Sequence, residues 1–325
     1  MTDTSDVETY GALQDKVPQA PPRSQWRDVW DQFRKHKGAL FGGGFLLFIT
    51  LAVILGPYLW DVDPKKLDIR NKDWRPIYTL LWDSDAKAGW LHPFGTDNLG
   101  RDILAQMLAG GRVSMAVGWL AMVLALVIGT AIGVAAGYFK RMDFWLMRFT
   151  DLVLSLPILP LVLLAVTLFR QPLNSFFGSP EAGMFVLIVG VIGLTSWMQT
   201  ARIVRGDILA LKEREFILAA RSIGTRPAKI IRRHLLPNVI SPIMVSATLG
   251  LATAIITESA LSFLGVGFPS DFPTWGKLLA DAVPRMQEYP ERVLLPGIAI
   301  SLTVLGVNYL GDGLRDALDP RIRGR

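Results

Sequence analysis

The side chains suited to covalent or metal chemistry are few and scattered in this chain of 325 residues. Cysteine is absent, which excludes thiolate nucleophiles, disulfides and cysteine-based metal sites. The three histidines, His36, His92 and His234, are far apart, and they form no HExxH metal pattern. The phosphate-binding pattern GxxxxGKS/T and the nucleophile elbow GxSxG do not occur either. We therefore expect a chain that is not an enzyme and does not bind ATP itself.

One polar cluster invites a metal hypothesis, because His92 is followed closely by Asp97 and Asp102. Short polar side chains of this kind are typical of turns and of helix N-caps, where they accept hydrogen bonds from nearby backbone N–H groups. We therefore interpret the cluster as turn and cap chemistry, and no metal site is predicted.

The elements that must position the remaining polar residues are long apolar blocks. About half of the residues, 51%, are hydrophobic, and they are concentrated in runs without charge. About 20 such residues cross a bilayer as a helix. Six blocks qualify, and they are residues 38–60, 113–139, 152–169, 182–201, 239–257 and 293–311. The sequence therefore predicts an all-α membrane protein with six transmembrane helices.

The distribution of basic residues predicts the orientation. If the N-terminus is cytoplasmic, 22 of the 34 Lys and Arg residues lie in cytoplasmic segments and 12 lie outside. This is the positive-inside bias of membrane proteins, so the basic composition requires no nucleic-acid partner. Both termini are expected in the cytoplasm.

The same reasoning divides the chain into segments. Residues 1–37 form a cytoplasmic tail and an amphipathic helix, 38–60 the first transmembrane helix, 61–112 an extracytoplasmic segment, and 113–325 a five-helix core. Within 23–37, Trp26, Trp30 and Phe33 recur at helical spacing between basic residues, which favours a helix on the inner membrane surface over a plain polar lead-in. Residues 1–22 lack the charge and apolar pattern of a cleaved signal peptide.

The most informative cytoplasmic segment is the loop 202–238. Residues 215–223 suit a short helix, and Gly224 permits a tight reversal because it lacks a Cβ atom. Thr225 is expected to cap a second helix, with Pro227 near its start and Pro237 at its end. We interpret this helix–turn–helix as a surface for a cytoplasmic partner.

The loop resembles the permease signature of bacterial ABC importers, in which an "EAA" segment and a glycine precede an "I-x-L-P" segment. The matching residues here are Leu218-Ala219-Ala220, Gly224 and His234-Leu235-Leu236-Pro237. The departures, Leu218 for Glu and His234 for an aliphatic residue, are similar to the oligopeptide/dipeptide branch. Residues 92–114, 257–267, 273–279 and 311–321 also resemble that branch. The resemblance thus covers nearly the whole chain after residue 23.

The resemblance implies a type I ABC importer permease in the bacterial inner membrane, contributing half of a path for oligopeptides or dipeptides. The implied partners are a second homologous permease, two cytoplasmic ATPases that bind ATP and Mg²⁺, an extracytoplasmic binding protein and membrane lipid. No cofactor is implied for this chain itself. Nickel chelates and opines remain open as solutes. The residues implied to couple to the ATPase are Glu215, Ala219, Ala220, Gly224, His234, Leu236 and Pro237.

Other interpretations of these residues stay open. Glu215 is also typical of an ordinary first-turn acid, and the small residues that follow it also suit close contacts within the loop. Two acids are expected within spans, Asp151 near the cytoplasmic end of the third and Glu258 toward the outer end of the fifth. Asp151 has the spacing for a local ion pair with Arg148, and a role in the pathway is the second interpretation. Glu258 requires a partner or water inside the membrane, which favours a structural role at an outer gate over contact with solute.

Two further features bear on the class of transporter. Gly129, Gly133 and Gly137 recur every four residues and predict close helix contact, either within the chain or with a partner. An ATP-independent secondary transporter is the rival class. Such proteins usually show paired broken helices or several intramembrane ionisable residues, whereas only two such acids occur here.

Overall fold

The computed structural model describes residues 25–318 except 82, 270 and 271. The predicted tail 1–22, the end of the 311–321 motif and the side chain of Trp26 lie outside this description. In the described part of the chain, six helices are long and apolar enough to cross a membrane, as predicted. They are α3 (Lys37–Leu59), α4 (Ile103–Tyr138), α6 (Ile158–Phe177), α7 (Pro180–Leu211), α11 (Ile240–Phe263) and α13 (Pro290–Leu318).

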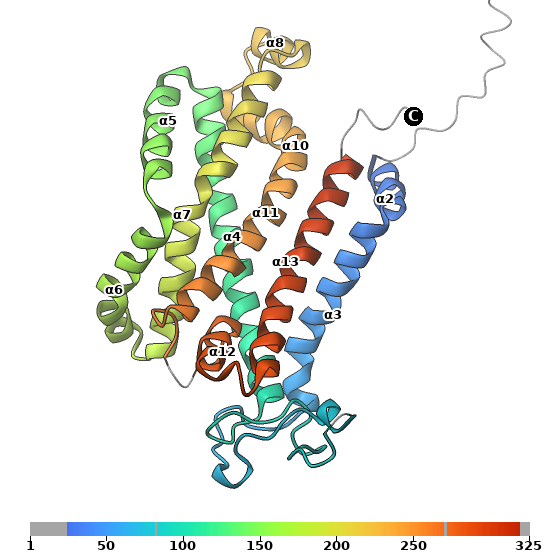
Figure 1. The fold of residues 1–325 in the computed structure, drawn as a ribbon. Coiled ribbons are helices and arrows are strands. Elements are labelled where there is room, and N and C mark those ends of the chain that lie inside the picture. Colours follow the sequence, from blue (N-terminus) through green and yellow to red (C-terminus); the bar gives the residue numbers. More distant parts are fainter. Residues whose placement is uncertain (1–24, 82, 270–271, 319–325) are drawn as a thin grey trace, which may run out of the picture.

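Shorter helices lie at the two ends of the bundle (Figure 1). At the upper end of the view are α2 (Gln25–Lys35), α5 (Lys140–Ser155), α8 (Glu215–Ser222), α9 (Pro227–Ile230) and α10 (Leu236–Asn238). At the lower end are α12 (Trp275–Ala282) and the 3-10 turns η1 (Ile69–Asn71), η2 (Ile77–Leu81) and η4 (Val283–Arg285). The start of α2 and the end of α13 lie at the same end, as an even number of spans requires.

The second span begins earlier than predicted. Residues 103–112, assigned from sequence to the extracytoplasmic segment, are the first turns of α4. Asp102 caps this helix, because its Oδ1 accepts a hydrogen bond of 2.6 Å from the Ala105 N–H. The charge at Arg112 does not end the helix, since its guanidinium donates to the carbonyl groups of Val53 and Ile54 on α3.

The third predicted span, residues 152–169, is displaced. The chain breaks at Leu156 and Pro157, which separates α5 from the membrane helix α6. A proline lacks the N–H group that a continuing helix needs and restricts the residue before it, which explains the break. Asp151 consequently lies on α5 and outside the third span, which corrects its predicted position.

The core of the bundle is the contact between α4 and α7. A Cβ atom built on Gly129 would lie 2.6 Å from the Trp197 carbonyl oxygen, and one on Gly133 would lie 2.6 Å from that of Ala201. The glycine stripe therefore packs within the chain, which decides between the two interpretations left open by the sequence. Small residues allow the two backbones to approach closely along this stretch of α4.

Candidate functional site: a cytoplasmic hairpin and an outer junction

The loop predicted to face a partner folds as a hairpin over residues 215–238. We call it the cytoplasmic hairpin after its predicted side of the membrane. Its first arm is α8, which ends in a left-handed residue, Gly224, with φ +75°. The Thr225 N–H donates to the Ala220 carbonyl over 3.1 Å, and the Gly224 N–H donates to the Arg221 carbonyl over 2.9 Å. These two bonds form a Schellman motif, in which glycine avoids the steric penalty of a Cβ atom.

The second arm differs from the prediction in two details. Arg226, not Thr225, occupies the N-cap position before Pro227. The helix then widens into a π turn over Ile231–Leu235 and continues as α10, so Pro237 does not end it. A proline ring clashes with the carbonyl group four residues earlier in a regular α-helix. The wider π turn before Pro237 relieves that clash, and the helix ends one residue later, at Asn238.

Apolar side chains on the inner side of the hairpin form a buried core together with residues of the membrane helices. Ile217, Ile230 and Leu235 are fully or almost fully buried. They cluster with Val204 and Ile208 near the end of α7. Burying an aliphatic side chain of this size contributes about 1.5–3 kcal/mol. The hairpin is therefore packed against α7 through its own apolar side chains.

The outer side carries side chains that the chain leaves uncovered. Ile223 is 81% exposed, and Phe216 and Leu218 are each 44% exposed. Ala219, Glu215 and Gly224 are also exposed. Among the described residues, no atom lies within 4 Å of a Cβ atom built on Gly224. Three of the residues predicted to couple to the ATPase, Glu215, Ala219 and Gly224, therefore have access to a partner at this arm.

The other predicted residues have mixed positions. Ala220 is 8% exposed and lies in the buried cluster, so it faces the chain's own core. His234 is half-buried beside Phe216, with ring centroids 6.3 Å apart, and its carbonyl accepts a 2.6 Å bond from the Asn238 side chain. Leu236 is half-buried and Pro237 is exposed.

Two ion pairs connect α5 to α7 beside the hairpin. Arg205 donates to both carboxylate oxygens of Asp143, over 2.5 and 2.8 Å. This hydrogen-bonded pair lowers the pKa of Asp143 below its ordinary value, against the opposing effect of partial burial. Asp151 pairs with Arg202 and not with Arg148, which corrects the predicted local pair. Arg148 lies over the ring of Phe144 instead, 5.4 Å from its centroid.

At the opposite end of the bundle, Glu258 of α11 is fully buried. Its Oε1 accepts a 2.7 Å hydrogen bond from the Ser262 hydroxyl, and the side chains of Ser114 and Thr274 also face it. Oε2 has no partner with hydrogen-bond geometry among the described residues. We call this cluster, together with the start of α12, the outer junction.

The helices of the outer junction are in unusually close contact. The Trp275 indole N–H donates to the Met107 carbonyl over 3.0 Å, and its ring would lie 2.8 Å from a Cβ atom on Gly111. A Cβ atom on Gly276 would lie 2.6 Å from Ser259 Cα. Three sequence motifs, residues 92–114, 257–267 and 273–279, therefore meet at this junction. Each motif was recognised in the sequence, but the sequence did not predict that the three lie together.

The suspected metal cluster has a structural role. His92 Nδ1 lies 2.7 Å from Asp102 Oδ2, while the other oxygen of Asp102 caps α4. Asp97 binds the Arg101 side chain over 2.6 Å. In the described part of the chain, no three His, Asp or Glu side chains are placed to hold a metal ion.

The sequence matches two family models. Residues 125–324 match the binding-protein-dependent transport system inner membrane component. Residues 24–78 match the N-terminal transmembrane domain of oligopeptide transport permease C. Together the two matches cover both the first span and the region that contains the hairpin.

Curated relatives match over most of their length. The oligopeptide transport system permease protein OppC of Bacillus subtilis is 36% identical, over 92% of this chain and 91% of that protein. The dipeptide transport system permease protein DppC of Alkalihalophilus pseudofirmus is 36% identical over 94% and 95%, respectively. The OppC of Haemophilus influenzae is 36% identical over 93% and 90%.

A solved structure shares the fold. A chain of the MetNI methionine ABC transporter, in an inward-facing conformation, superposes with a TM-score of 0.52 at 17% sequence identity. The superposition covers 65% of this chain and 95% of that chain. The identity is low, so this likeness concerns the arrangement of helices alone. The chain belongs to the multi-pass inner-membrane permeases of binding-protein-dependent ABC transport, in the oligopeptide and dipeptide permease C branch, a non-catalytic component whose complex hydrolyses ATP on partner subunits.

Proposed function

We propose that this permease forms half of a translocation path for oligopeptides or dipeptides, delivered by an extracytoplasmic binding protein. The support for the solute is the set of relatives, which are named as oligopeptide and dipeptide permeases and match over more than nine-tenths of this chain. The rival class, an ATP-independent secondary transporter, is set aside by membership of an ATP-driven family.

The cytoplasmic hairpin is, in this proposal, the contact with one of two ATPase subunits. The observation that carries it is the two-sided burial of the hairpin: Ile217 and Leu235 are buried against α7, whereas Phe216, Leu218 and Ile223 are exposed. Exposed apolar side chains outside the membrane are typical of a protein interface. Exposed Glu215 and Ala219 lie on the same helix and belong to the proposed contact surface.

Movement of the ATPases would reach the membrane through α7 and α4. The Lys212 ammonium donates to the Gly137 carbonyl at the end of α4 over 3.2 Å, directly beside the start of the hairpin. From there the glycine stripe joins α4 to α7, and the Asp143–Arg205 and Asp151–Arg202 pairs join α5 to α7. We assign Asp151 to this anchoring and not to the pathway. A displacement of the hairpin would thus move three helices together.

The second homologous permease would lie against the side of the bundle that carries α6. This helix packs mainly on α7, and its outward face presents Leu164, Leu168, Phe169 and Phe176, which are 54–81% exposed. Lipid suits such a face, and so does a second permease, which is also needed to complete a path. Glu258, buried at the opposite end from the hairpin, would hold the outer gate closed.

Cysteine substitution tests the hairpin and its orientation, since the chain has no native cysteine. Asp85 and Ala219 are exposed at opposite ends of the bundle, and Ala220 is buried beside Ala219. On intact cells, a membrane-impermeant maleimide should label Asp85→Cys and spare Ala219→Cys. In opened membranes, Ala219→Cys should react until the ATPases bind, and Ala220→Cys should react poorly throughout. Labelling of Ala219→Cys that ATPase subunits do not reduce would refute the proposed contact.

A further inference from the structure

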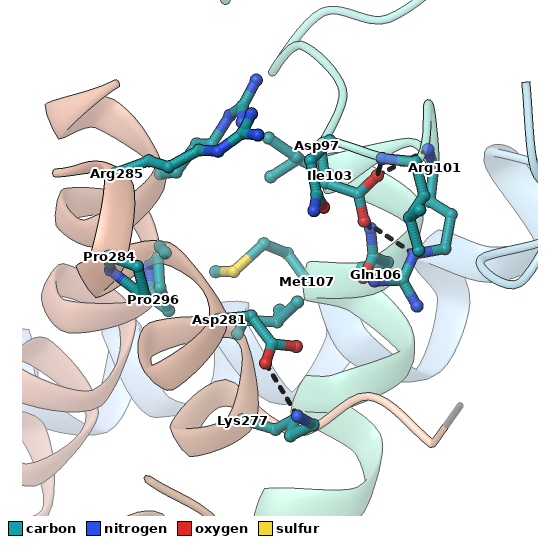
Figure 2. Close-up of a pocket in the computed structure, with 15 residues that line it drawn as sticks. Asp97, Arg101, Ile103, Gln106, Met107, Lys277, Asp281, Pro284, Arg285 and Pro296 are labelled. Atoms are coloured by element: carbon teal, nitrogen blue, oxygen red, sulfur yellow. Dashed lines mark hydrogen bonds and ion pairs between the residues drawn. The ribbon is translucent and has the colours of Figure 1, made fainter. Parts of the chain in front are cut away.

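A cavity lies beside the outer junction, outside the path and the hairpin discussed above. Its volume is about 460 Å³, within the usual range of about 300–1,000 Å³ for small-molecule sites. It opens between the start of α4 and the segment formed by α12, η4 and the start of α13. Figure 2 shows Met107, Pro284 and Pro296 along its middle, Arg285 towards one end, and the Lys277–Asp281 pair at the other.

The charges around the cavity do not cancel. Its lining holds four cationic side chains, those of Arg101, Lys277, Arg285 and Arg292, and two carboxylates, those of Asp97 and Asp281. Arg101 pairs with Asp97 over 2.6 Å, and Lys277 pairs with Asp281 over 2.7 Å.

The two remaining arginines share a single acid. Asp73, which lies outside the lining, accepts from both Arg285, over 3.2 Å, and Arg292, over 3.0 Å. The lining side chains and Asp73 together carry one more positive charge than negative charges.

Arg292 beside this cavity has two side-chain nitrogens without a hydrogen-bond partner among the described residues. The residue is only 8% exposed, yet its side chain lines the cavity. Asp73 occupies Nη1 alone, and Nε and Nη2 have no hydrogen-bond partner among the described residues. These two nitrogens form one edge of the guanidinium plane, which is the edge that binds both oxygens of a carboxylate. A buried guanidinium with that edge unpaired is a costly arrangement for a protein to keep.

Among the described residues, the acids nearest Arg292 do not supply the missing partner. Glu291 also has an unpartnered carboxylate oxygen, but it precedes Arg292 directly on α13, and consecutive helix residues do not face each other. Asp97 and Asp281 are occupied by Arg101 and Lys277. Among the described residues, no carboxylate fills the Nε–Nη2 edge of Arg292, which is itself shielded from solvent.

We propose that this extracytoplasmic cavity binds a small carboxylate with an apolar body, its two oxygens on the Nε–Nη2 edge of Arg292. Leu99, Ile103, Met107 and Leu278 supply the apolar wall for that body. Arg285 is the movable member of the site. Its side chain is 45% exposed and is held to Asp73 only by bonds of 3.2 and 3.4 Å, so it can turn aside to admit the ligand and then add a second cation.

The test uses the full chain assembled with its partner subunits in lipid nanodiscs. The probes are N-acetyl-L-leucine and its matched neutral analogue N-acetyl-L-leucinamide, with affinity measured by thermophoresis. We expect saturable binding of the acid and at least tenfold weaker binding of the amide. Arg292→Gln should weaken binding of the acid at least tenfold. Arg292→Lys, which keeps the charge but loses the planar fork, should weaken it several-fold.

Matched controls separate the site from general charge and from folding. Lys72→Gln removes a positive charge from an exposed position next to Asp73 that does not line the cavity, and it should leave affinity unchanged. If Arg292→Gln does not accumulate, two measurements still test the site. They are the affinity of Arg292→Lys for the acid and the difference between acid and amide binding by the wild type. Equal affinity for acid and amide, no saturable binding by the wild type, or wild-type affinity in Arg292→Lys would each overturn the proposal. Weakened docking of the binding protein in Arg292→Gln, without carboxylate binding, would assign the cavity to a protein partner and also overturn it.

Discussion

The outer junction and the cytoplasmic hairpin lie at opposite ends of α4 and treat polar and apolar side chains in opposite ways. The outer junction encloses a carboxylate, Glu258, among hydroxyl groups, and Trp275 at the start of α12 is also buried. The hairpin instead leaves Phe216, Leu218 and Ile223 uncovered. A buried polar cluster is stable only when its members satisfy each other, whereas an exposed apolar surface is stabilised by a partner. The outer junction therefore buries its polar groups inside this chain, whereas the hairpin leaves apolar surface that a partner can cover.

The largest expected effect is loss of the folded protein when the outer junction is overfilled. In Gly276→Leu, even the Cβ atom would lie 2.6 Å from Ser259 Cα, and backbone cannot move aside as a side chain does. Overfilling of this kind costs about 1–3 kcal/mol or more. We expect the membrane-fraction level, measured by immunoblot, to fall at least tenfold. Gly190→Leu is the matched control, since no atom of the described residues lies within 4 Å of a Cβ atom at that membrane position. Equal levels of the two variants would disprove the tight junction.

The next effect concerns the hairpin and should leave the protein level intact. Gly224 has a left-handed φ and open space around it, so Gly224→Trp adds local strain of about 1–2 kcal/mol and places a bulky ring on the partner-facing surface. We expect wild-type abundance with at least a tenfold loss of peptide uptake and poor capture of the ATPase. Gly224→Ala carries the strain without the bulk and should retain most uptake. If Gly224→Trp transports at the wild-type rate, the hairpin is not the coupling element.

A paired substitution sharpens the division between the two sides of the hairpin. Ala219 is exposed and Ala220 is buried, so the same tryptophan should fail for different reasons at the two positions. Ala219→Trp should fold normally and lose ATPase binding. Ala220→Trp should disturb the core around Ile217 and lower the thermal midpoint of the purified chain by several degrees, consistent with about 1–3 kcal/mol of overfilling. The same thermal midpoint in both variants would contradict the observed burial.

Glu258 offers a smaller and graded test of the outer junction. Glu258→Gln keeps the size of the side chain and an acceptor for the Ser262 hydroxyl, so abundance and uptake should stay within about twofold of wild type. Glu258→Ala leaves buried hydroxyl groups without a partner, at about 1–3 kcal/mol, and should lower the thermal midpoint. A Gln variant that folds normally but loses uptake would show that the charge contacts solute and is not merely structural.

The smallest effect is expected at the pair that fastens α5. The pKa of Asp143 is lowered in the folded chain by Arg205, so the pair stabilises the fold above the ordinary carboxyl pKa and this contribution is lost as pH falls through the folded pKa. Both side chains are partly exposed, so Asp143→Asn should change stability by no more than about 1 kcal/mol at pH 7. The difference between the variant and wild type should shrink in acid, as measured by thermal unfolding at several pH values. A difference that grows in acid would contradict the assigned direction.

The sequence alone determined the features that depend on local chemistry. Six uncharged blocks specified six spans, because a bilayer requires about 20 apolar residues in succession. The short helix 215–222 and the turn at Gly224 were predicted correctly, since glycine is the residue that adopts the left-handed conformation without strain. The order of motifs along the chain was sufficient to identify the family.

Tertiary structure decided everything that depends on distant partners. Asp151 has Arg148 at a suitable spacing but pairs with Arg202 on another helix, because the break at Pro157 places α5 beside α7. The glycine stripe had two possible neighbours, and only the assembled bundle shows that α7 is the one.

At both ends of the molecule, the surroundings of a residue could not be predicted from its local sequence. Ala219 and Ala220 are the same residue type in adjacent positions, and only the buried cluster beneath α8 sends one to solvent and the other to the core. The unpaired edge of Arg292 could not be predicted from the sequence. It arises because Asp73, more than 200 residues earlier, binds only Nη1, so that Nε and Nη2 have no partner among the described residues. Local spacing determines which residues are available, and the three-dimensional arrangement of helices determines which of them meet.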